Sequence, residues 1–492
     1  MQGKILLRVP NWLGDAVMSL PALWAVKGAF PEASLSVLAR ASVADLYGDD
    51  PHVDEVILYE GKALGARWRL LRRLRRERFQ LAVLLQNAFD AALLARLSGI
   101  PERWGYARDL RGPLLSKAVP CGTKERGLHH IQYYLHMLRA LGLEAPFRMP
   151  WIYLSLRERL WAREMLKGLR RPVVGLCPGA AYGQAKRWRG FASLARLLPK
   201  ELGGSVLVLG SRADEAVARE VASAQVLSLV GRSSLREFFA LASQCDALVS
   251  NDSGAMHVGY AVGVPVVAVF GSTDPALTGP PPGAAARIIR RELHCSPCFE
   301  RHCPEGHLRC LEDISPREVL QALKELLPSR RAVFLDRDGT LCQDPGYLSR
   351  WEDFRPLPGL QELRRLKEAG FLLVGITNQS GIARGLVREE FVQEVNAYFL
   401  REHGFDAFYY CPHHPREHCS CRKPSPGMLL RARAELGVDL RRSWLVGDKE
   451  LDLEAAQAVG ARAVKVGAPM GLKKAVEFIL KEELKDANSP GD

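Results

Sequence analysis

The sequence lacks any uninterrupted apolar run of the roughly 18 residues that a membrane-spanning helix needs. Its longest apolar stretch, around Tyr260–Gly271, is broken by glycine and proline and indicates a loop leading into a buried strand. The start of the sequence is also not expected to be a signal peptide, because the apolar run Ile5–Leu7 is short and Arg8 interrupts it. We therefore expect a globular protein that stays in the cytoplasm. Its 492 residues are too many for one hydrophobic core.

Acidic residues are in the minority. There are 55 of them against 68 lysines and arginines, which gives a net charge of +13. Such a chain attracts anionic partners, among which composition alone does not choose: nucleic acid, acidic membrane or phosphorylated substrates. Cysteine is not scarce. The 11 cysteines are odd in number and clustered, which in a reducing cytosol indicates metal binding before disulfides.

One basic segment is unusual for its density of arginine. Seven arginines fall within twelve residues, and Leu64, Trp68, Leu71 and Leu74 recur among them at helical spacing: Arg67, Arg69, Arg72, Arg73, Arg75, Arg76 and Arg78. The pattern predicts an amphipathic helix. Two interpretations stay open. The apolar stripe packs on its own domain, or the helix rests against anionic lipid headgroups as a peripheral contact with the cytoplasmic face of the inner membrane.

Strand and helix patterns alternate along the chain and restart twice. This predicts an α/β protein with parallel sheets covered on both faces. The restarts give an N-terminal domain over 1–155, a second over 156–328, and a third over 329–480, followed by a polar tail over 481–492 that we expect to fray. Strands are expected at 4–9, 34–39, 55–58, 81–85, 172–177, 206–209, 247–250, 264–270, 332–335, 372–376 and 444–446.

The strongest motif is the run Phe334–Thr340, in which an apolar strand ends in Asp336 and Asp338. Alternate residues of a strand share a face, so both carboxylates can point into one site, and loops after parallel strands are where such folds place their chemistry. The run resembles the DxDGT signature of the haloacid-dehalogenase (HAD) phosphatases. Their other elements follow in order at Thr377, Lys423 and Asp448, with Asp452 four residues on.

The resemblance implies a role for each of these residues. Asp336 would be the nucleophile that accepts the phosphoryl group, and Asp338 the acid and base. Mg²⁺ would be held by Asp336, Asp338 and Asp448, with a backbone carbonyl among the ligands. Phosphate and substrate contacts would come from a basic and polar set: Thr377, Asn378, Arg384, Arg422, Lys423 and Lys449.

Within that superfamily three runs narrow the resemblance. Thr377–Gly385, Tyr410–Pro415 and Cys419–Pro424 resemble the D-glycero-D-manno-heptose-1,7-bisphosphate 7-phosphatases, over about residues 331–468. That family has a zinc loop in place of a large cap domain. Three thiolates and one imidazole supply a Zn²⁺ set, with His414 and His418 as alternative nitrogen ligands: Cys411, His413, Cys419 and Cys421. A thiol cluster without metal is the other interpretation.

The first two domains carry motifs that are weak indicators of function when taken singly and stronger ones when taken together. They are Asn11–Val17, Cys177–Ala180, Gln184–Trp188 and Ser250–His257, several of which lie between a strand and a helix. A helix start offers free N–H groups and a positive dipole end to a diphosphate, although each motif alone could be a plain helix cap. Across residues 4–328 they resemble the ADP-heptose:lipopolysaccharide heptosyltransferases, and heptosyltransferase II most closely.

That resemblance implies a GT-B fold of two Rossmann-like domains, with the donor bound mainly by the second. Asp15 would be the general base of an inverting transfer. ADP-heptose would be bound or oriented by five residues of the second domain: Lys186, Asp252, Ser253, Gly254 and His257. A second cysteine cluster, with His294, His302 and His307 nearby, has irregular spacing, and both a structural metal and a reduced packed loop stay open: Cys295, Cys298, Cys303 and Cys310.

Taken together, the sequence predicts a bifunctional enzyme of lipopolysaccharide core heptose metabolism. One part would transfer heptose from ADP-L-glycero-D-manno-heptose to a heptosyl-Kdo-lipid A acceptor, as the second heptose. The other would remove the 7-phosphate of D-glycero-D-manno-heptose 1,7-bisphosphate. No nucleic-acid partner is expected. The alternatives are a GDP-heptose route, another nucleotide sugar, or one half kept as a non-catalytic binding module.

Overall fold

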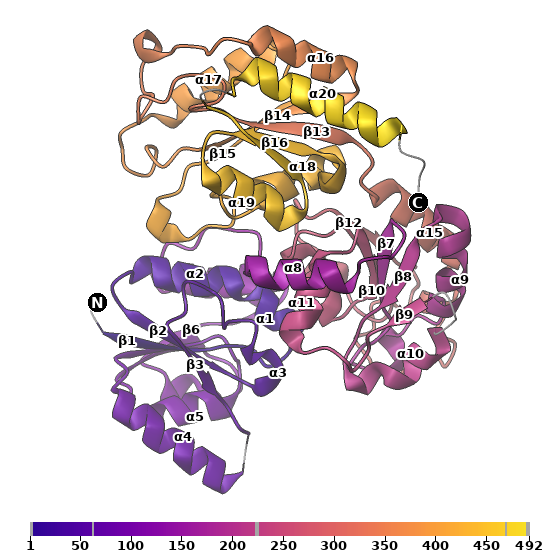
Figure 1. The fold of residues 1–492 in the computed structure, drawn as a ribbon. Coiled ribbons are helices and arrows are strands. Elements are labelled where there is room, and N and C mark those ends of the chain that lie inside the picture. Colours follow the sequence, from indigo (N-terminus) through magenta and orange to yellow (C-terminus); the bar gives the residue numbers. More distant parts are fainter. Residues whose placement is uncertain (1–2, 62, 222–225, 468–469, 489–492) are drawn as a thin grey trace. The chain divides into compact units, whose positions relative to one another are not determined.

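The computed structural model describes residues 3–61, 63–221, 226–467 and 470–488. The chain forms two compact units, Met1–Leu327 and Pro328–Asp492. The first unit contains two six-stranded sheets and the second unit one five-stranded sheet, and every strand pair in them is parallel (Figure 1). The expected α/β architecture with parallel sheets is therefore confirmed.

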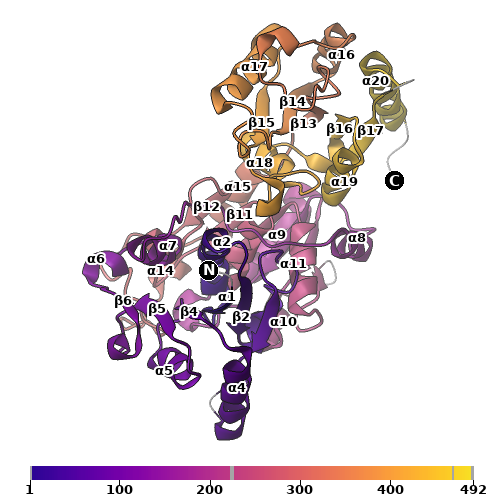
Figure 2. The ribbon, with the colours of Figure 1, turned by 90° about the vertical axis from the view of Figure 1, so that its left-hand side faces the viewer.

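The first sheet has the strand order β3-β2-β1-β4-β5-β6. The apolar runs of β1 and β4 are buried, as expected for central strands of a parallel sheet covered on both faces. Figures 1 and 2 show α4 and α5 on the opposite side of this sheet from α1 and α2. The elements are β1 Lys4–Arg8, α1 Leu13–Met18, α2 Leu20–Ala29, β2 Ser34–Ala39, α3 Ala41–Ala44, β3 Glu55–Leu58, α4 Leu64–Glu77, β4 Leu81–Leu84, α5 Phe89–Leu97, β5 Glu102–Tyr106, β6 Lys117–Val119, α6 Thr123–Arg126 and α7 His130–Ala140.

The second sheet repeats the pattern with the order β12-β11-β10-β7-β8-β9. Its elements are α8 Leu156–Met165, β7 Val173–Cys177, α9 Phe191–Leu202, β8 Ser205–Val208, α10 Glu215–Val221, β9 Val226–Ser228, α11 Leu235–Ser243, β10 Ala247–Asn251, α12 Gly254–Ala261, β11 Val266–Val269, α13 Pro275–Thr278, β12 Ala286–Ile289, α14 Arg309–Glu312 and α15 Pro316–Leu326. In both sheets the strand order reverses beside the first strand, between β1 and β4 and between β7 and β10. Ligand sites of such folds form at the carboxyl ends of the strands at this reversal.

The third sheet has the order β15-β14-β13-β16-β17. Its elements are β13 Arg331–Asp336, α16 Leu363–Glu368, β14 Phe371–Asn378, α17 Glu389–Glu402, β15 Ala407–Cys411, α18 Gly427–Leu436, β16 Trp444–Gly447, α19 Glu450–Val459, β17 Arg462–Lys465 and α20 Leu472–Asn488. Side chains from the segment between β13 and β14 and from α17 join the same hydrophobic core as the strands. These segments therefore pack onto the sheet as part of one hydrophobic core.

The expectation of a frayed tail from residue 481 is wrong for residues 481–488, because α20 continues to Asn488. Glu483 anchors this end by accepting hydrogen bonds from Trp444 Nε1 at 2.9 Å and Arg331 Nη1 at 2.7 Å, and it also pairs with Arg462. Residues 489–492 lie outside the described residues. Among the residues that are described, no helix is long and apolar enough to cross a bilayer.

Candidate functional sites

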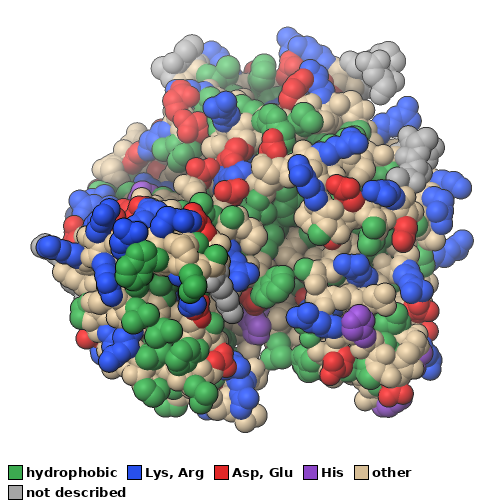
Figure 3. All heavy atoms as spheres, turned by 90° about the horizontal axis from the view of Figure 1, so that it is seen from below, with side chains coloured by type: hydrophobic (Ala, Val, Ile, Leu, Met, Phe, Trp, Pro, Cys, Tyr) green, Lys and Arg blue, Asp and Glu red, His purple; other side chains and the backbone are tan. Residues whose placement is uncertain are grey.

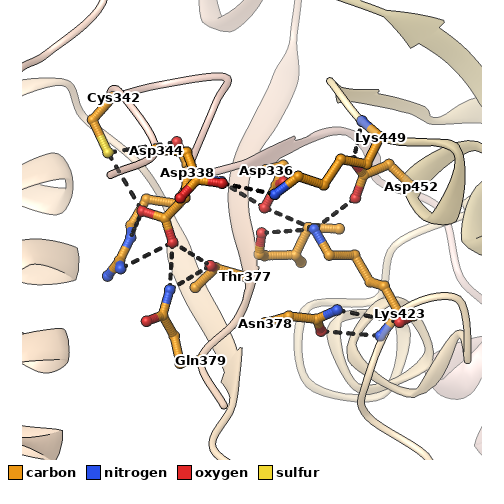
Figure 4. A network of polar contacts seen from close by, with 12 residues as sticks. Asp336, Asp338, Cys342, Asp344, Thr377, Asn378, Gln379, Lys423, Lys449 and Asp452 are labelled. Carbon is orange, nitrogen blue, oxygen red and sulfur yellow. Dashed lines mark hydrogen bonds and ion pairs between the residues drawn. The ribbon is translucent and has the colours of Figure 1, made fainter. Parts of the chain in front are cut away.

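The carboxyl ends of β13, β14 and β16 bring the motif residues of the second unit together. Asp336 is the last residue of β13, Asn378 the last of β14, and Asp448 follows β16 directly. Because β13 lies between β14 and β16, these ends adjoin one another. They surround a cavity whose polar network is shown in Figure 4, and its lining includes Asp336, Asp338, Thr377, Asn378, Arg422, Lys423 and Lys449.

Lys423 is the buried cation of this network. Its Nζ lies 2.7 Å from Asp336 Oδ1 and 2.6 Å from Asp452 Oδ1, and all three side chains are almost fully buried. Burial by itself lowers the pKa of Lys423, but attraction to the two carboxylates outweighs it and raises the pKa above 10.5. Lys423 therefore stays charged at neutral pH. Asp336 Oδ1 also accepts the backbone N–H of Arg337 at 2.8 Å, which fixes the orientation of that carboxylate.

Asp338 lies beside Asp336 but has different partners. Its carboxylate accepts hydrogen bonds from Gln379 Nε2 at 2.6 Å, Thr377 Oγ1 at 3.3 Å and Arg337 Nε at 3.0 Å. Gln379 was not among the residues predicted from the sequence, although it lies two residues after Thr377. These three donors hold the carboxyl group of Asp338 over the cavity.

Three carboxylates at these strand ends lie close enough together to hold a cation. Oxygens of Asp336, Asp448 and Asp452 lie within 4.8 Å of one another. Asp448 Oδ1 is buried and has no hydrogen-bond partner among the described residues, and burial raises its pKa. A hard cation such as Mg²⁺ would satisfy that oxygen. The carboxylate of Asp338 lies outside this group and is engaged by Arg337, Thr377 and Gln379, so its part in holding Mg²⁺ stays a prediction.

The other residues predicted to contact phosphate or substrate differ in how close they lie to the cavity. The side chain of Asn378 makes two hydrogen bonds to the backbone of Lys423. Its Oδ1 accepts the N–H of Lys423 at 3.0 Å, and its Nδ2 donates to the carbonyl of Lys423 at 3.2 Å. Arg422 lines the cavity, and its buried Nη1 has no partner among the described residues. Lys449 lies at the rim, 2.8 Å from Asp344, a residue that was not predicted from the sequence. Arg384 is exposed and is not among the lining residues.

The four expected zinc ligands do come together. The ligand atoms of Cys411, His413, Cys419 and Cys421 lie within 4.8 Å of one another, with His413 Nδ1 3.2 Å from Cys421 Sγ. Three thiolates and one imidazole at this spacing fit a tetrahedral Zn²⁺ site. His414 is engaged elsewhere, since its Nδ1 accepts the N–H of Arg416 at 3.2 Å. The loop closed by this cluster leads directly into Arg422 and Lys423.

In the first unit, helix α1 carries Asp15 and packs closely against α12. A Cβ on Gly14 would lie 2.7 Å from His257 Cδ2, and one on Gly254 would lie 3.0 Å from Leu13 Cβ. Glycine at both positions therefore permits the close approach of the two helices. Asp15 Oδ1 lies 2.9 Å from Nδ1 of His130, the first residue of α7. His130 is 115 residues away in sequence and was not singled out from it.

Lys186 is held at the carboxyl end of the second sheet by Asp252. Its Nζ lies 2.5 Å from Asp252 Oδ2, which also accepts the hydroxyl of Thr273 at 2.5 Å. Asn251 Oδ1 accepts the backbone N–H of Trp188 at 3.0 Å, which ties the loop of Lys186 to the end of β10. Asp252 therefore positions Lys186, and the turn through Ser253 and Gly254 lies beside them at the start of α12.

His257 is buried behind this turn. Its Nδ1 lies 2.9 Å from the hydroxyl of Tyr260. Burial lowers the pKa of His257 to about 4, so the ring is neutral at pH 7. It can offer a hydrogen bond at the α1–α12 contact but no charge.

The second cysteine cluster lies in a loop that contacts the Lys186 loop, and among the described residues its sulfurs do not gather into a ligand set. Cys295 Sγ lies 4.0 Å from His307 Nε2, and Cys303 Sγ accepts the N–H of Leu308 at 3.4 Å. The same loop contacts the Lys186 loop, where Arg301 O accepts the N–H of Ala185 at 3.2 Å. The loop of the second cysteine cluster therefore contacts the Lys186 loop through its backbone, and whether the cluster binds a metal stays open.

Comparisons with known proteins divide the chain in the same way. A family model described as glycosyltransferase family 9 (heptosyltransferase) matches residues 67–309, and one described as HAD-hydrolase-like matches residues 420–475. Lipopolysaccharide heptosyltransferase 2 of Escherichia coli K12 is 33% identical over 350 residues, which cover 67% of this chain and 100% of the relative. The solved E. coli ADP-heptose lipopolysaccharide heptosyltransferase II matches with a TM-score of 0.57 and 32% identity, over 65% of this chain and 98% of that one.

The C-terminal part has its own relatives. The D-glycero-beta-D-manno-heptose-1,7-bisphosphate 7-phosphatase of Yersinia pestis is 44% identical over 155 residues, which cover 28% of this chain and 82% of the relative. The likenesses to a heptosyltransferase of known structure and to a HAD phosphatase confirm the expected fold classes of the two parts.

Proposed function

The chain belongs, over its N-terminal two thirds, to the lipopolysaccharide heptosyltransferases of glycosyltransferase family 9 and, over its C-terminal part, to the heptose-bisphosphate 7-phosphatases, and we propose that it catalyses both reactions. The first transfers heptose from ADP-heptose to the inner core of lipopolysaccharide, as the second heptose. The second hydrolyses the 7-phosphate of D-glycero-D-manno-heptose 1,7-bisphosphate. The observation that carries the proposal for the phosphatase is Asp336 paired with the buried Lys423 beside the unpartnered oxygen of Asp448.

In the phosphatase, a carboxylate oxygen of Asp336 would attack phosphorus, and the bond from phosphorus to the sugar oxygen would break. Asp338 would give its proton to that leaving oxygen. It would then take a proton from the water that attacks the aspartyl phosphate and releases inorganic phosphate. Lys423 supports the first step by orienting Asp336 and by placing a positive charge near the incoming phosphoryl oxygens.

Two metal ions would support this chemistry. Mg²⁺, held by Asp336 and Asp448, would offset the negative charge between carboxylate and phosphate. Zn²⁺, held by Cys411, His413, Cys419 and Cys421, would keep the loop that presents Arg422 and Lys423 in one conformation. The unpartnered Nη1 of Arg422 makes it the group we assign to the other phosphate of the substrate.

In the transferase, the acceptor hydroxyl would attack the anomeric carbon of the donor while Asp15 takes its proton. The bond from that carbon to the diphosphate oxygen would break, ADP would leave, and the configuration would invert. Lys186 and the first N–H groups of α12 would neutralise the leaving diphosphate. Because the proposed acceptor is lipid-anchored, transfer would take place at a membrane surface, and we propose the cytoplasmic face of the inner membrane.

Two nearly isosteric variants of the full chain test the assignment. Asp336→Asn removes the nucleophile, so phosphate release should be lost while heptosyl transfer is unchanged. Asp15→Asn should lower transfer by roughly 10²–10⁴-fold with ADP-heptose affinity and phosphate release retained. Products are followed by mass spectrometry with heptose bisphosphate, and with ADP-heptose or GDP-heptose plus a truncated lipid A core.

Each assignment has an outcome that would contradict it. Near-normal phosphate release from Asp336→Asn would remove the phosphatase mechanism. A transfer rate within about threefold of wild type for Asp15→Asn would leave Asp15 as a helix cap, because asparagine caps about as well as aspartate.

A further inference from the structure

Helix α4 carries more apolar side chains than its own domain buries. Leu70, Leu71 and Leu74 are packed into the hydrophobic core of the first sheet. Leu64 and Trp68 are not, and remain 86% and 54% exposed. The sequence pattern had placed Leu64, Trp68, Leu71 and Leu74 on one stripe, whereas the structure divides that stripe into a buried half and an exposed half.

The arginines of α4 divide in a similar way. Arg67, Arg69 and Arg73 pair with acidic residues on neighbouring segments: Asp90, Glu60 and Glu55. For Arg72, Arg75, Arg76 and Arg78, no carboxylate of the described residues is a partner. Arg72 instead lies over the ring of Trp68, 5.8 Å from its centre. The exposed tryptophan is thus set among unneutralised positive charges.

Helix α5 extends this surface. It lies alongside α4, because Arg67 pairs with Asp90 near its start and Arg75 Nε donates to Leu97 O near its end at 3.0 Å. Phe89 and Leu97 of α5 are also exposed. Figure 3, which views the molecule from the side of α4, shows hydrophobic and basic side chains next to one another on this part of the surface.

We propose that the α4 face, defined as Leu64, Trp68, Arg72, Arg75 and Arg76, docks onto the surface of a bilayer rich in anionic phospholipid. Leu64 and Trp68 would enter the headgroup region, where tryptophan is favoured because its ring is apolar and its N–H is polar. The unpaired arginines match the negative surface charge. An acidic protein or a nucleic acid would satisfy the arginines but would not require an exposed leucine and tryptophan between them.

This docking does not depend on either proposed reaction. It is tested with vesicles that contain neither acceptor saccharide nor donor, so its failure is distinct from a failure of the transferase assignment. The full-length protein is mixed with vesicles of phosphatidylglycerol and phosphatidylethanolamine, or of phosphatidylcholine alone, and the bound fraction is measured by flotation. We expect binding to the anionic vesicles that weakens steeply with salt and little binding to phosphatidylcholine.

Two double variants separate charge from insertion. Arg72→Gln with Arg76→Gln should lower the partition coefficient about 25-fold at low salt, at about fivefold for each arginine. Leu64→Ser with Trp68→Ser should lower it at least about tenfold, and should also remove the binding that remains at high salt. The matched control is Arg219→Gln with Arg364→Gln, which removes the same charge from exposed sites elsewhere and should change binding by less than about threefold.

Folding is checked by amide exchange in β1 and β4, which should not change in either double variant. The proposal is overturned if wild type binds both vesicle types equally, or if the control pair weakens binding as much as Arg72→Gln with Arg76→Gln. It is also overturned if the wild type prefers a short DNA duplex to the anionic vesicles in direct competition.

Discussion

Replacing Lys423 with methionine removes the cation that lies between two buried carboxylates. In the structure its Nζ is 2.7 Å from Asp336 and 2.6 Å from Asp452, and the exposed fractions of the three side chains are between 0 and 7%. Methionine has a similar volume, so the change leaves little cavity. It leaves Asp336 and Asp452 close together with Asp448 and without a positive charge between them.

The magnitude follows from this burial. Removing one partner of a buried ion pair typically costs about 3–5 kcal/mol, because the other charge stays desolvated and unpaired. Each 1.36 kcal/mol changes an equilibrium constant tenfold. The cost therefore corresponds to roughly a 10²- to 5 × 10³-fold rise in the population of molecules in which this β-sheet is open. The matched control is Lys449→Met. Lys449 and Asp344 are 47% and 30% exposed, and a pair of that kind is worth about 0–1 kcal/mol.

Amide hydrogen exchange of the full-length protein measures this quantity segment by segment. Peptides from β13, β14 and β16 should exchange faster in Lys423→Met by the factor given above, whereas peptides from β1 and β7 should not change. Lys449→Met should alter exchange by less than about fivefold. Adding Asp452→Asn to Lys423→Met should restore part of the protection, because it removes one of the two buried carboxylates that the loss of Lys423 leaves unpaired.

The reasoning would be refuted by equal exchange in Lys423→Met and Lys449→Met. It would also be refuted if Asp452→Asn made the Lys423→Met protein less stable still. Either outcome would mean that Lys423 is not needed to offset buried charge.

Three further predictions concern other parts of the molecule. His130→Ala removes the side chain that lies 2.9 Å from Asp15. It should lower kcat of heptosyl transfer by roughly 10-fold or more and leave the KM for ADP-heptose little changed. An unchanged kcat would show that His130 does not position Asp15. Elemental analysis should find one zinc ion per chain in the wild type and none in Cys419→Ser. Removing the zinc with a chelator should weaken phosphate release but not heptosyl transfer. A wild-type protein without zinc would contradict the site. The pKa of His257 is about 4 when folded against 6.5 when unfolded, so the stability that it contributes is complete above pH 6.5 and is lost as the pH falls toward 4, by about 3 kcal/mol. His257→Gln should flatten the pH dependence of exchange in β10, and an unchanged slope would contradict the burial argument.

The elements and motifs that depend on neighbours in the chain could be predicted from the sequence. The strands at 34–39 and 55–58 were predicted at the bounds the structure shows, because each is an apolar run between turn residues. Asp336 and Asp338 could be located because a charged pair directly after an apolar strand has few structural explanations. The ligands Cys411 to Cys421 lie within eleven residues, so their spacing alone indicated one site.

Only the tertiary structure decided what those side chains touch. The pairing of His130 with Asp15 and of Lys423 with Asp452 joins residues on different elements, and no local periodicity records such a contact. The same holds for Asp252, which is engaged by Lys186 and Thr273, and for Asp338, which points away from the proposed magnesium group toward Gln379. The sequence showed that α4 is amphipathic. Which of its leucines the core would cover depended on the packing of α4 over the sheet, and that packing left Leu64 and Trp68 exposed.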